Sequence, residues 1–483
     1  MFNSITFNKR IGQHIIYLYP LLFIMGTIIN IILGVFPGLQ NDTQSRIAIG
    51  GYIIIAIIIG LNFINVLMHT EKKLRLFIIV ILISLIGMAP FILGLLFNGE
   101  LFIYEILFKY ILFEIPMCLL ASCIIVEQKI TSFILSFKWY GVIVIPFCVF
   151  YIGRILLADD VSLDYINFKS VNYMSIAYML MPVIVCLLIE TVFLNRRHAL
   201  AKLALMLLLW VTLLFTGTRG AVLCVFFCIG MAILYEIIWN SCRNVKPIIS
   251  ILLIMILSYC FFVFIWSPQS SGANYRLNGF SREITKYDFD ENNKVTLNLP
   301  NQNGKKVEKN SSVLDCYLNY MVESSNKGAI SIREIKNGQA EFLKYMNKEE
   351  RESVQQYEFI PNRMELFKLA FKEAKKHLIV GNGLFYFQNK YETYPHNMIL
   401  EYLCDFGIIG ASVFVLIVIG LMVQLIRKVK FKNDLLPALL FILSYIPQFM
   451  ISGTIYFNPI AMFAISYAII YLFYNKDENT IKR

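Results

Sequence analysis

Charged residues are scarce in this sequence. Asp, Glu, Lys and Arg make up 16% of its 483 residues, hydrophobic residues make up 58%, and the mean hydropathy is +0.65. A chain with so few charges and so much apolar surface would not stay soluble as a globular domain. The composition therefore excludes an ordinary soluble protein and predicts an all-α polytopic membrane protein.

Motifs for metal ions and disulfides are lacking as well. The ten cysteines lie mostly within apolar runs and form no C-x-x-C pair, and none of the five histidines has the spacing of a metal ligand. Neither a zinc site nor a disulfide framework is indicated. We expect no metal ion and no cofactor, and we interpret the cysteines as small buried hydrophobic residues.

Long apolar runs are what the sequence has in abundance. A helix needs about 20 apolar residues, at 1.5 Å per residue, to cross roughly 30 Å of hydrocarbon. Twelve segments meet this need. The predicted spans are residues 15–35, 47–67, 76–96, 103–126, 139–157, 172–194, 201–217, 220–239, 247–266, 398–426, 435–452 and 456–474.

Lys and Arg fall in alternate loops, and this bias sets the orientation of the spans. The N-terminal segment has no small-residue cleavage site, so we expect it to be retained as the first span. Both termini are then cytoplasmic. The basic loops are residues 9–10, 69–75, 129–138, 195–202, 242–246, 427–432 and 476–483. Most of the net charge of +11 lies in these loops, where topology and anionic lipid explain it, and no nucleic-acid partner is expected.

One long polar stretch interrupts the spans. The predicted organisation is spans one to nine in residues 1–266, an extracytoplasmic loop in 267–395, spans ten to twelve in 396–474 and a cytoplasmic tail in 475–483. Loops of this length are commonly functional. Within it, the alternation of residues 293–300 predicts a strand of a hairpin.

The end of this loop has helical periodicity. Residues 362–377 form a predicted amphipathic helix that begins after Pro361, with Asn362 and Glu365 in a capping arrangement. A helix of this kind near a membrane lies on the bilayer surface or covers the mouth of the bundle. Its expected apolar face is Met364, Phe367, Phe371 and Ala374.

Three arginines near the predicted outer surface need a reason. Arg219 lies between spans seven and eight, flanked by Gly217 and Gly220. It is either a snorkelling residue that anchors the turn, or an anion-binding residue beside the N-terminus of span eight. Arg363 is a cation in the first turn of the amphipathic helix, where the helix dipole disfavours positive charge, and a bound anion would offset this cost. A solvated surface arginine explains the residue equally well. Arg154, at the outer end of span five, could join an anion site.

A polar stripe marks the start of span ten. His396 follows a proline at the point of entry, and Asn397, Glu401 and Asp405 follow at four-residue steps on one helix face. Carboxylates at membrane depth cost about 2.5 kcal/mol or more unless they face a cavity or a cation, which predicts a functional cavity. His396 is either a base for a substrate hydroxyl or a capping residue at the interface.

Three stretches together resemble one family, the O-antigen ligase and polymerase superfamily. "FTGTRGAVL" (215–223) is similar to its Thr-Gly-(Ser/Thr)-Arg-Gly motif, and "NRMELFKLAFKEAKKHLIVGNGLFYF" (362–387) resembles its Arg-x-x-x-(Trp/Phe) helix with a Gly-x-Gly turn. "PHNMILEYLCDFGIIG" (395–410) resembles its His-Asn-x-x-Leu motif with a later Gly-x-x-Gly.

The resemblance implies a metal-independent, inverting glycosyltransferase with a GT-C-like bundle in the bacterial inner membrane. Its donor would be an undecaprenyl-diphosphate-linked oligosaccharide, and its acceptor a sugar hydroxyl on a lipid-linked repeat unit or on the lipid A core. By motif, Arg219 and Arg363 would bind the diphosphate, and His396 would orient or deprotonate the acceptor. Membrane lipids, a chain-length regulator and a flippase of the same pathway are the further implied partners.

Several functions remain open on the sequence. Within the family, polymerase and ligase are not separated, although the long and idiosyncratic loop favours a polymerase that reads one repeat unit. A transporter or flippase also fits twelve spans, but such folds are commonly built of repeats with a site near the bilayer midplane. No repeat is apparent here, and the charged candidates cluster at one interface. A non-catalytic assembly protein is the third alternative.

Overall fold

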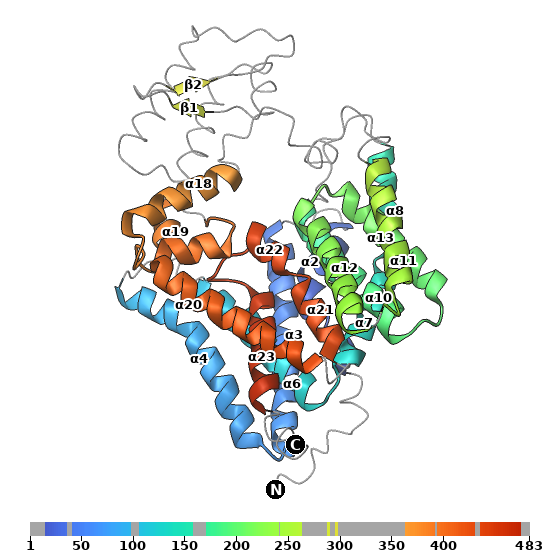
Figure 1. Cartoon of the computed structure of the whole chain (residues 1–483), viewed down its shortest axis with the longest axis horizontal. Coiled ribbons are helices and arrows are strands. Elements are labelled where there is room, and N and C mark those ends of the chain that lie inside the picture. Colours follow the sequence, from blue (N-terminus) through green and yellow to red (C-terminus); the bar gives the residue numbers. More distant parts are fainter. Residues whose placement is uncertain are drawn as a thin grey trace. The chain divides into compact units, whose positions relative to one another are not determined.

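The computed structural model describes residues 15–35, 41–97, 106–157, 171–240, 242–262, 287–289, 295–297, 363–391, 394–429 and 435–474. Contacts within the chain divide it into two units, whose elements are labelled in Figure 1. The first unit comprises Met1–Gly279, Val415–Ser452 and Tyr456–Arg483, and the second comprises Phe280–Phe414 and Gly453–Ile455.

The described part of the first unit is helical throughout. Its elements in chain order are η1 (Ile16–Leu18), α2 (Leu21–Val35), α3 (Asn41–His69), α4 (Lys73–Phe97), η2 (Tyr110–Glu114), α6 (Ile115–Val126), α7 (Ile130–Ile143), α8 (Ile145–Leu156), α10 (Tyr173–Ile189), η3 (Glu190–Leu194), α11 (Ala199–Phe215), α12 (Arg219–Trp239), α13 (Val245–Cys260), α21 (Leu436–Leu443), α22 (Ile446–Ile451) and α23 (Pro459–Tyr474). The second half of α20 (Met398–Val429) also belongs to this unit.

Helix α10 is the central helix of the first unit. It contacts α2, α7, α11, α12 and α21, and every residue from Met179 to Ile189 is buried. Such an all-round apolar helix is expected at the centre of a bundle. Its first turn is capped by Asn172, whose side-chain oxygen accepts a hydrogen bond from the Met174 N–H at 2.9 Å.

Aromatic packing joins helices that are distant in sequence. Five phenylalanine rings from α2, α7, α21 and α23 form one cluster, with centroids 5.2–6.2 Å apart in mostly edge-on or tilted pairs. This spacing is the favourable one for aromatic pairs. The cluster therefore fixes α2 and α7 against α21 and α23. Its members are Phe23, Phe133, Phe137, Phe441 and Phe463.

Each predicted apolar segment overlaps one or two helices in the described part of the chain. Among the described residues, six helices are long and apolar enough to cross a membrane, or seven if the bent pair α7–α8 is one span. Five further apolar helices have between 10 and 17 residues, as α11 and α13 do. A polytopic α-helical membrane protein is thus confirmed. The number of twelve spans stays a prediction.

The boundary of the fifth predicted span was wrong. Residues 129–138 were expected to form a basic loop, but α7 begins at Ile130 and joins α8 at a bend of 48°. Ile130, Phe133, Ile134 and Phe137 are buried at three- and four-residue spacing, so the segment is an amphipathic helix. Hydropathy averaged over a long window hides such a short stripe.

Two buried carboxylates of the first unit have specific partners. Glu190 lies 2.7 Å from the Lys202 ammonium and 3.4 Å from that of Lys138. Glu236 accepts hydrogen bonds from the backbone N–H of Asn244 at 2.7 Å and from the side chain of Asn240 at 2.8 Å. Burying a charge is tolerated only with such partners.

The described residues of the second unit form a hairpin and four helical segments. Strand β1 (Tyr287–Phe289) pairs antiparallel with β2 (Val295–Leu297), which confirms the predicted hairpin. After it come α18 (Arg363–Ala374), η5 (Lys375–His377), α19 (Tyr386–Tyr391) and the first half of α20.

Helix α18 lies within the segment where an amphipathic helix is predicted, but the predicted apolar face was partly wrong. Phe371 is exposed, whereas Leu366, Ala370 and Ala374 are buried against Phe387 and Cys404. The two alanines allow close approach to these larger side chains, so small residues define the buried face. The exposed ring of Phe371 instead contacts Lys375, whose ammonium nitrogen lies 4.7 Å from the centre of the Phe371 ring.

Candidate active site

The turn that carries Arg219 is built from short-range contacts. Gly217 has a φ of 64°, in the left-handed region that favours glycine, and its N–H donates to the Leu214 carbonyl at 2.9 Å. The Thr216 hydroxyl donates to the Leu213 carbonyl at 2.7 Å, and Thr218 is buried beside it. Arg219 is then the first residue of α12. The backbone therefore holds Arg219 at a helix N-terminus, where an anion is favoured.

Gly220 serves packing as well as the turn. A Cβ at this position would overlap the Tyr178 hydroxyl of α10. The space beside Gly220 is therefore taken by Tyr178, whose hydroxyl lies 3.4 Å from that of Ser452. Arg219 itself is partly exposed. Close packing of α12 on α10 explains the glycine without a ligand.

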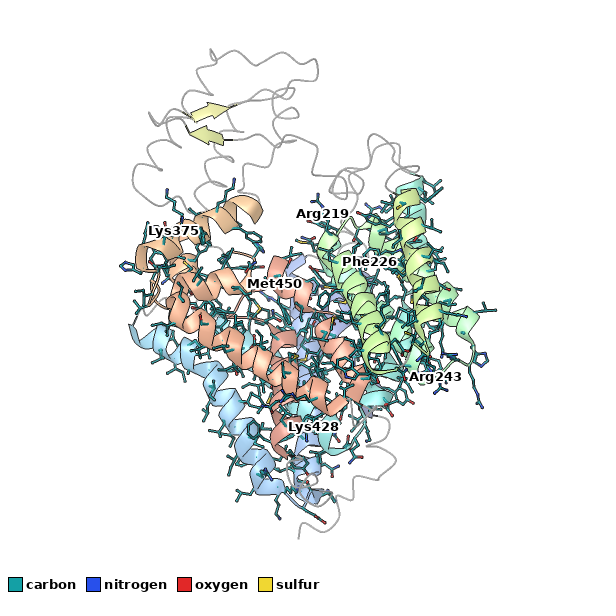
Figure 2. All side chains as sticks on the ribbon, in the orientation of Figure 1. Arg219, Phe226, Arg243, Lys375, Lys428 and Met450 are labelled. Atoms are coloured by element: carbon teal, nitrogen blue, oxygen red, sulfur yellow. The ribbon has the colours of Figure 1, made fainter. Side chains whose placement is uncertain are left out.

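Arg219 lies at the opposite end of the first unit from the basic residues Arg243 and Lys428, as Figure 2 shows. Arg243 follows the C-terminal end of α12, and Arg219 begins that helix. This separation agrees with the predicted alternation of basic loops. Arg154 lies in the last turn of α8 and is half-buried, a position where the helix dipole favours a cation.

His396 has an unusual backbone conformation. Its φ is 57°, which L-residues with side chains rarely adopt, and its ring lies on that of Tyr394 with centroids 4.1 Å apart. Asn397 caps α20, because its side-chain oxygen accepts a hydrogen bond from the Leu400 N–H at 3.0 Å. His396 is therefore not the capping residue. Strained residues of this kind cluster at functional sites.

Glu401 is fully buried one turn below Asn397. Its carboxylate accepts hydrogen bonds from the Thr454 hydroxyl at 3.0 Å, from the Ile455 N–H at 2.6 Å and from the side chain of Gln388. These donors come from the segment before α23 and from α19. Glu401 thus ties three parts of the second unit together, and its partners belong to the protein.

The last residue of the predicted stripe, Asp405, lies just before a break in α20. Gly407 has φ 65° and ψ −168°, which is not helical. The carbonyls of Cys404 and Asp405 therefore accept hydrogen bonds from the N–H groups of Asn382 and Gly383, both at 2.9 Å. The side chain of Asp405 is buried.

The same break supplies two donors in return. The N–H groups of Ile408 and Ile409 donate to the carbonyls of Leu378 and Ile379, at 2.8 and 3.3 Å. Residues 378–383 thus supply the hydrogen-bond partners that one turn of α20 lacks at the break. We call the paired segments 378–383 and 404–409 the helix splice. Hydrogen bonds lost at a kink must be replaced in this way when the backbone is buried.

Two glycines make the helix splice possible. A Cβ on Gly381, with φ 82°, would overlap the Asp405 carbonyl, and a Cβ on Gly407 would overlap the Ile379 carbonyl. The backbones approach too closely for any side chain. The Gly-x-Gly turn of one sequence motif and the glycine after Asp405 in the next motif are therefore partners in one contact.

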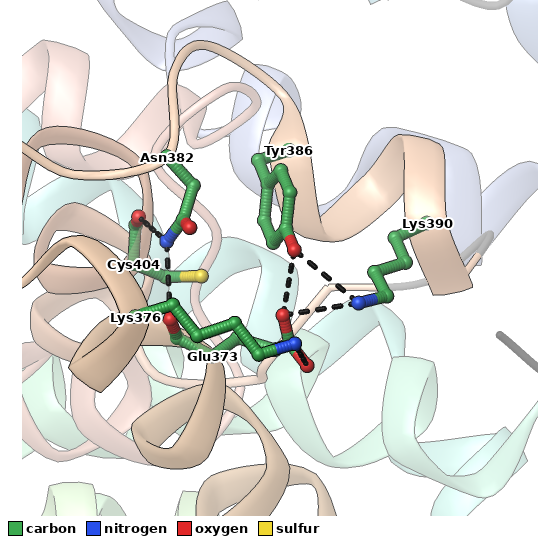
Figure 3. A network of polar contacts seen from close by, with 6 residues as sticks. All are labelled: Glu373, Lys376, Asn382, Tyr386, Lys390 and Cys404. Carbon is green, nitrogen blue, oxygen red and sulfur yellow. Dashed lines mark hydrogen bonds and ion pairs between the residues drawn. The ribbon is translucent and has the colours of Figure 1, made fainter. Parts of the chain in front are cut away.

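A polar cluster supports the splice from α18 (Figure 3). The buried carboxylate of Glu373 lies 2.9 Å from the Lys376 ammonium and 3.1 Å from that of Lys390, and it accepts the Tyr386 hydroxyl proton at 2.6 Å. Burial, then the bond to Glu373, raises the pKa of Tyr386 to about 12, so the phenol stays a donor at neutral pH. The Asn382 side chain bridges the carbonyls of Glu373 and Cys404 at 3.2 and 2.8 Å.

The predicted site residues are distributed over both units. Arg154, Gly217, Arg219 and Gly220 belong to the first unit. His396, Asn397, Glu401 and Asp405 lie together at the start of α20 in the second unit, and Arg363 begins α18 in that unit.

The sequence did not indicate the residues that hold the start of α20, with its predicted site residues, in place. Glu373, Asn382 and Gln388 are polar residues in or beside an amphipathic helix, where a solvated position is the ordinary expectation. Their partners are 9 to 22 residues away in sequence. The one available signal was the Gly-x-Gly turn at 381–383, which marks a close backbone approach.

The helices define a polytopic membrane protein, and a comparison with known families defines it further. Residues 204–415 match the model of a family described as O-antigen ligase. The match covers less than half of the chain, agrees with the family that the sequence motifs predict, and contains all three motifs. No curated protein and no solved structure matches the chain. The family indicates a ligase or polymerase that acts on lipid-linked glycans.

Proposed function

We propose that the protein is a membrane glycosyltransferase that acts on the outer face of the inner membrane. It transfers an undecaprenyl-diphosphate-linked glycan to an acceptor sugar hydroxyl, as a polymerase of polysaccharide repeat units. The observation that carries the proposal is the conformation of His396. A histidine held at positive φ, with its ring tilted by 44° against that of Tyr394, stands directly before a helix start that another residue caps. Capping does not explain this arrangement, whereas presentation of an imidazole to a substrate does.

The arginines supply the charge that the leaving group needs. Arg219 and Arg363 are each the first residue of a helix, α12 and α18, where the N–H groups are free of helical partners. Guanidinium groups bind phosphate oxygens bidentately and stay charged at every relevant pH. We assign both arginines to the diphosphate of the donor, with Arg154 as a further cation and the prenyl tail in the bilayer.

The reaction is a single displacement at the anomeric carbon. The acceptor oxygen forms a bond to this carbon while the bond to the diphosphate oxygen breaks, and the diphosphate leaves with the electron pair. The hydroxyl proton passes to a ring nitrogen of His396. A positioned base contributes typically 10²–10⁴ in rate, and preorganised cations that neutralise the leaving group contribute a term of similar or larger size.

Complementation of a deletion strain tests the proposal. We expect loss of surface polymer and accumulation of single repeat units in the deletion strain, with restoration by the wild-type gene but not by Arg219→Ala or His396→Ala. Arg243→Ala and His198→Ala are matched controls, because both residues are exposed and Arg243 lies at the other end of the first unit. Polymer of normal length with Arg219→Ala and His396→Ala would contradict the catalytic assignment.

The ligase is the second candidate, because the matching family is described as O-antigen ligase. The same strains separate the two functions. A ligase defect leaves polymer of full length on its lipid carrier, whereas a polymerase defect leaves single units. Lipid-linked units confined to the cytoplasmic leaflet would indicate a flippase and would contradict both transferase functions.

A further inference from the structure

Three apolar side chains project from the loop after η5. Leu378, Ile379 and Val380 are 39%, 66% and 69% exposed, and we call them the apolar tip. They belong to the segment that was predicted to lie wholly outside the membrane. Contiguous exposed apolar residues mark an interaction surface rather than a solvated loop.

The apolar tip lies beside a membrane-crossing helix. The carbonyls of Leu378 and Ile379 are bonded to the N–H groups of Ile408 and Ile409, which lie within the apolar span Met398–Val429. The side chains of these two isoleucines are 48% and 56% exposed. The tip therefore continues the exposed apolar face of α20, about three helical turns inside the start of the span.

Non-helical backbone at membrane depth must have its polar groups bonded within the protein. The carbonyls of Leu378 and Ile379 meet this condition. Besides the two bonds to α20, the Gly381 N–H donates to the His377 carbonyl at 2.7 Å. The next two N–H groups, of Asn382 and Gly383, donate to carbonyls of α20 at 2.9 Å. The helix splice thus lowers the cost of placing this loop in hydrocarbon.

Positive charge borders the tip on one side. The lysines that precede it in α18 and η5 are exposed, while the acid among them, Glu373, is buried and paired. Lysines beside inserted apolar residues reach to the headgroup layer and favour anionic lipids. These lysines are Lys368, Lys372, Lys375 and Lys376.

We propose that the apolar tip inserts into the bilayer, in the leaflet at the amino-terminal end of α20, with the lysines of α18 and η5 at the anionic headgroups. The occupant of this surface is lipid. If the tip lay in water, three adjacent apolar side chains would be exposed to it beside a membrane-crossing helix. The insertion does not depend on the transferase chemistry.

Depth-dependent quenching tests the insertion with the full chain. Ile379→Trp adds a fluorophore at the tip to the four native tryptophans. The protein is reconstituted in vesicles of phosphatidylcholine and phosphatidylglycerol, with bromine midway along the acyl chains of the phosphatidylcholine. We expect most of the emission that the Ile379→Trp variant adds over wild type to be lost in brominated vesicles. Asn310→Trp, in a polar stretch of the sequence, is the control whose added emission should persist.

Two outcomes would overturn the proposal. In one, the emission added by Ile379→Trp persists in brominated vesicles as that added by Asn310→Trp does. In the other, it persists and a photocrosslinker at position 379 joins two copies of the chain, which would make the tip an interface between protomers. Thermal unfolding of both variants in detergent, compared with wild type, verifies that each is folded.

The lysines are tested in the same system. The double substitution Lys372→Glu and Lys375→Glu in the Ile379→Trp chain should reduce the quenching in anionic vesicles more than in vesicles of phosphatidylcholine alone. An equal effect in both vesicles would contradict the role of anionic headgroups. Glycan transfer by the Ile379→Trp chain is measured in parallel, so a defect in catalysis is distinguished from a defect in insertion.

Discussion

The two turns that carry the proposed chemistry are built in opposite ways. In the first unit, the turn before Arg219 is held by hydrogen bonds between residues two or three positions apart, such as Thr216 to Leu213 and Gly217 to Leu214. In the second unit, the helix splice below His396 joins residues such as Asn382 and Cys404, which are 22 positions apart.

This difference shows where each side chain gets its position. The arginine is presented by a local turn, which forms from its own sequence wherever α11 ends. The histidine is presented by tertiary contacts, because the start of α20 is fixed by α18, α19 and the segment before α23. Local turns tolerate change in their surroundings, whereas a tertiary contact fails when any one of its segments moves.

Gly381→Ala should have the largest effect on the stability of this arrangement. The substitution places a side chain at φ 82° against the Asp405 carbonyl. The left-handed conformation costs about 1–2 kcal/mol, and a clash that the backbone must relieve adds about 1–3 kcal/mol. We expect a lower unfolding temperature in detergent and little folded protein in the membrane fraction.

Gly383→Ala is the matched control for this prediction. Its φ is 103°, but a Cβ there meets no atom within 4 Å. The control therefore carries the conformational strain without the clash, and Gly381→Ala should be the less stable variant by the cost of the clash. Equal stabilities would show that the two backbones separate easily and that the splice is not a tight contact.

The sequence predicted the local features and not the pairing. Apolar runs and turn glycines identified the helices, the turn at 216–220 and the amphipathic segment, because each depends on residues within a few positions. Nothing in the sequence indicates that Gly381 faces Asp405, since the contact requires two segments to meet in the folded chain. The motifs identified the glycines of the helix splice, but they did not show that the Gly-x-Gly turn and the segment around Gly407 contact each other.

The buried carboxylates show the same limit. The charge of Glu401 at membrane depth suggested a cavity, whereas the structure gives it three hydrogen-bond donors of the protein. Glu190 had no evident partner in sequence, but Lys138 and Lys202, which were expected to lie in basic loops, meet it in the fold. A buried acid is recognisable from sequence, but its partner is not.

Glu401→Ala should have the second largest effect. Removing the carboxylate leaves the Ile455 N–H, the Thr454 hydroxyl and the Gln388 amide without their acceptor. Leaving a buried donor unsatisfied costs about 1–3 kcal/mol, and water entering the vacated space satisfies the others, so the net cost should stay below that of Gly381→Ala. We expect a lower unfolding temperature, together with shorter surface polymer, because the start of α20 carries His396.

Glu401→Gln provides the comparison for that variant. The amide keeps one acceptor oxygen in nearly the same volume, so it should retain part of the stability that alanine loses. If both variants unfold as the wild type does, the three donors do not fix α20. The proposal that His396 is positioned by tertiary contacts would then fail for this contact.

The smallest effect is expected at the local turn, and it isolates the packing of α12 on α10. Gly220→Ala gains up to about 1 kcal/mol from the higher helix propensity of alanine, but its Cβ displaces the Tyr178 hydroxyl. These opposite contributions should leave the stability nearly unchanged.

Tyr178→Phe removes the obstructing oxygen, and the nearest remaining ring atom, at 3.5 Å, is in ordinary contact. In the Tyr178→Phe background, Gly220→Ala should therefore stabilise the protein by up to about 1 kcal/mol. Equilibrium unfolding of the four chains in mixed detergent measures this coupling, and a coupling of zero would show that the Tyr178 hydroxyl does not restrict the side chain at position 220.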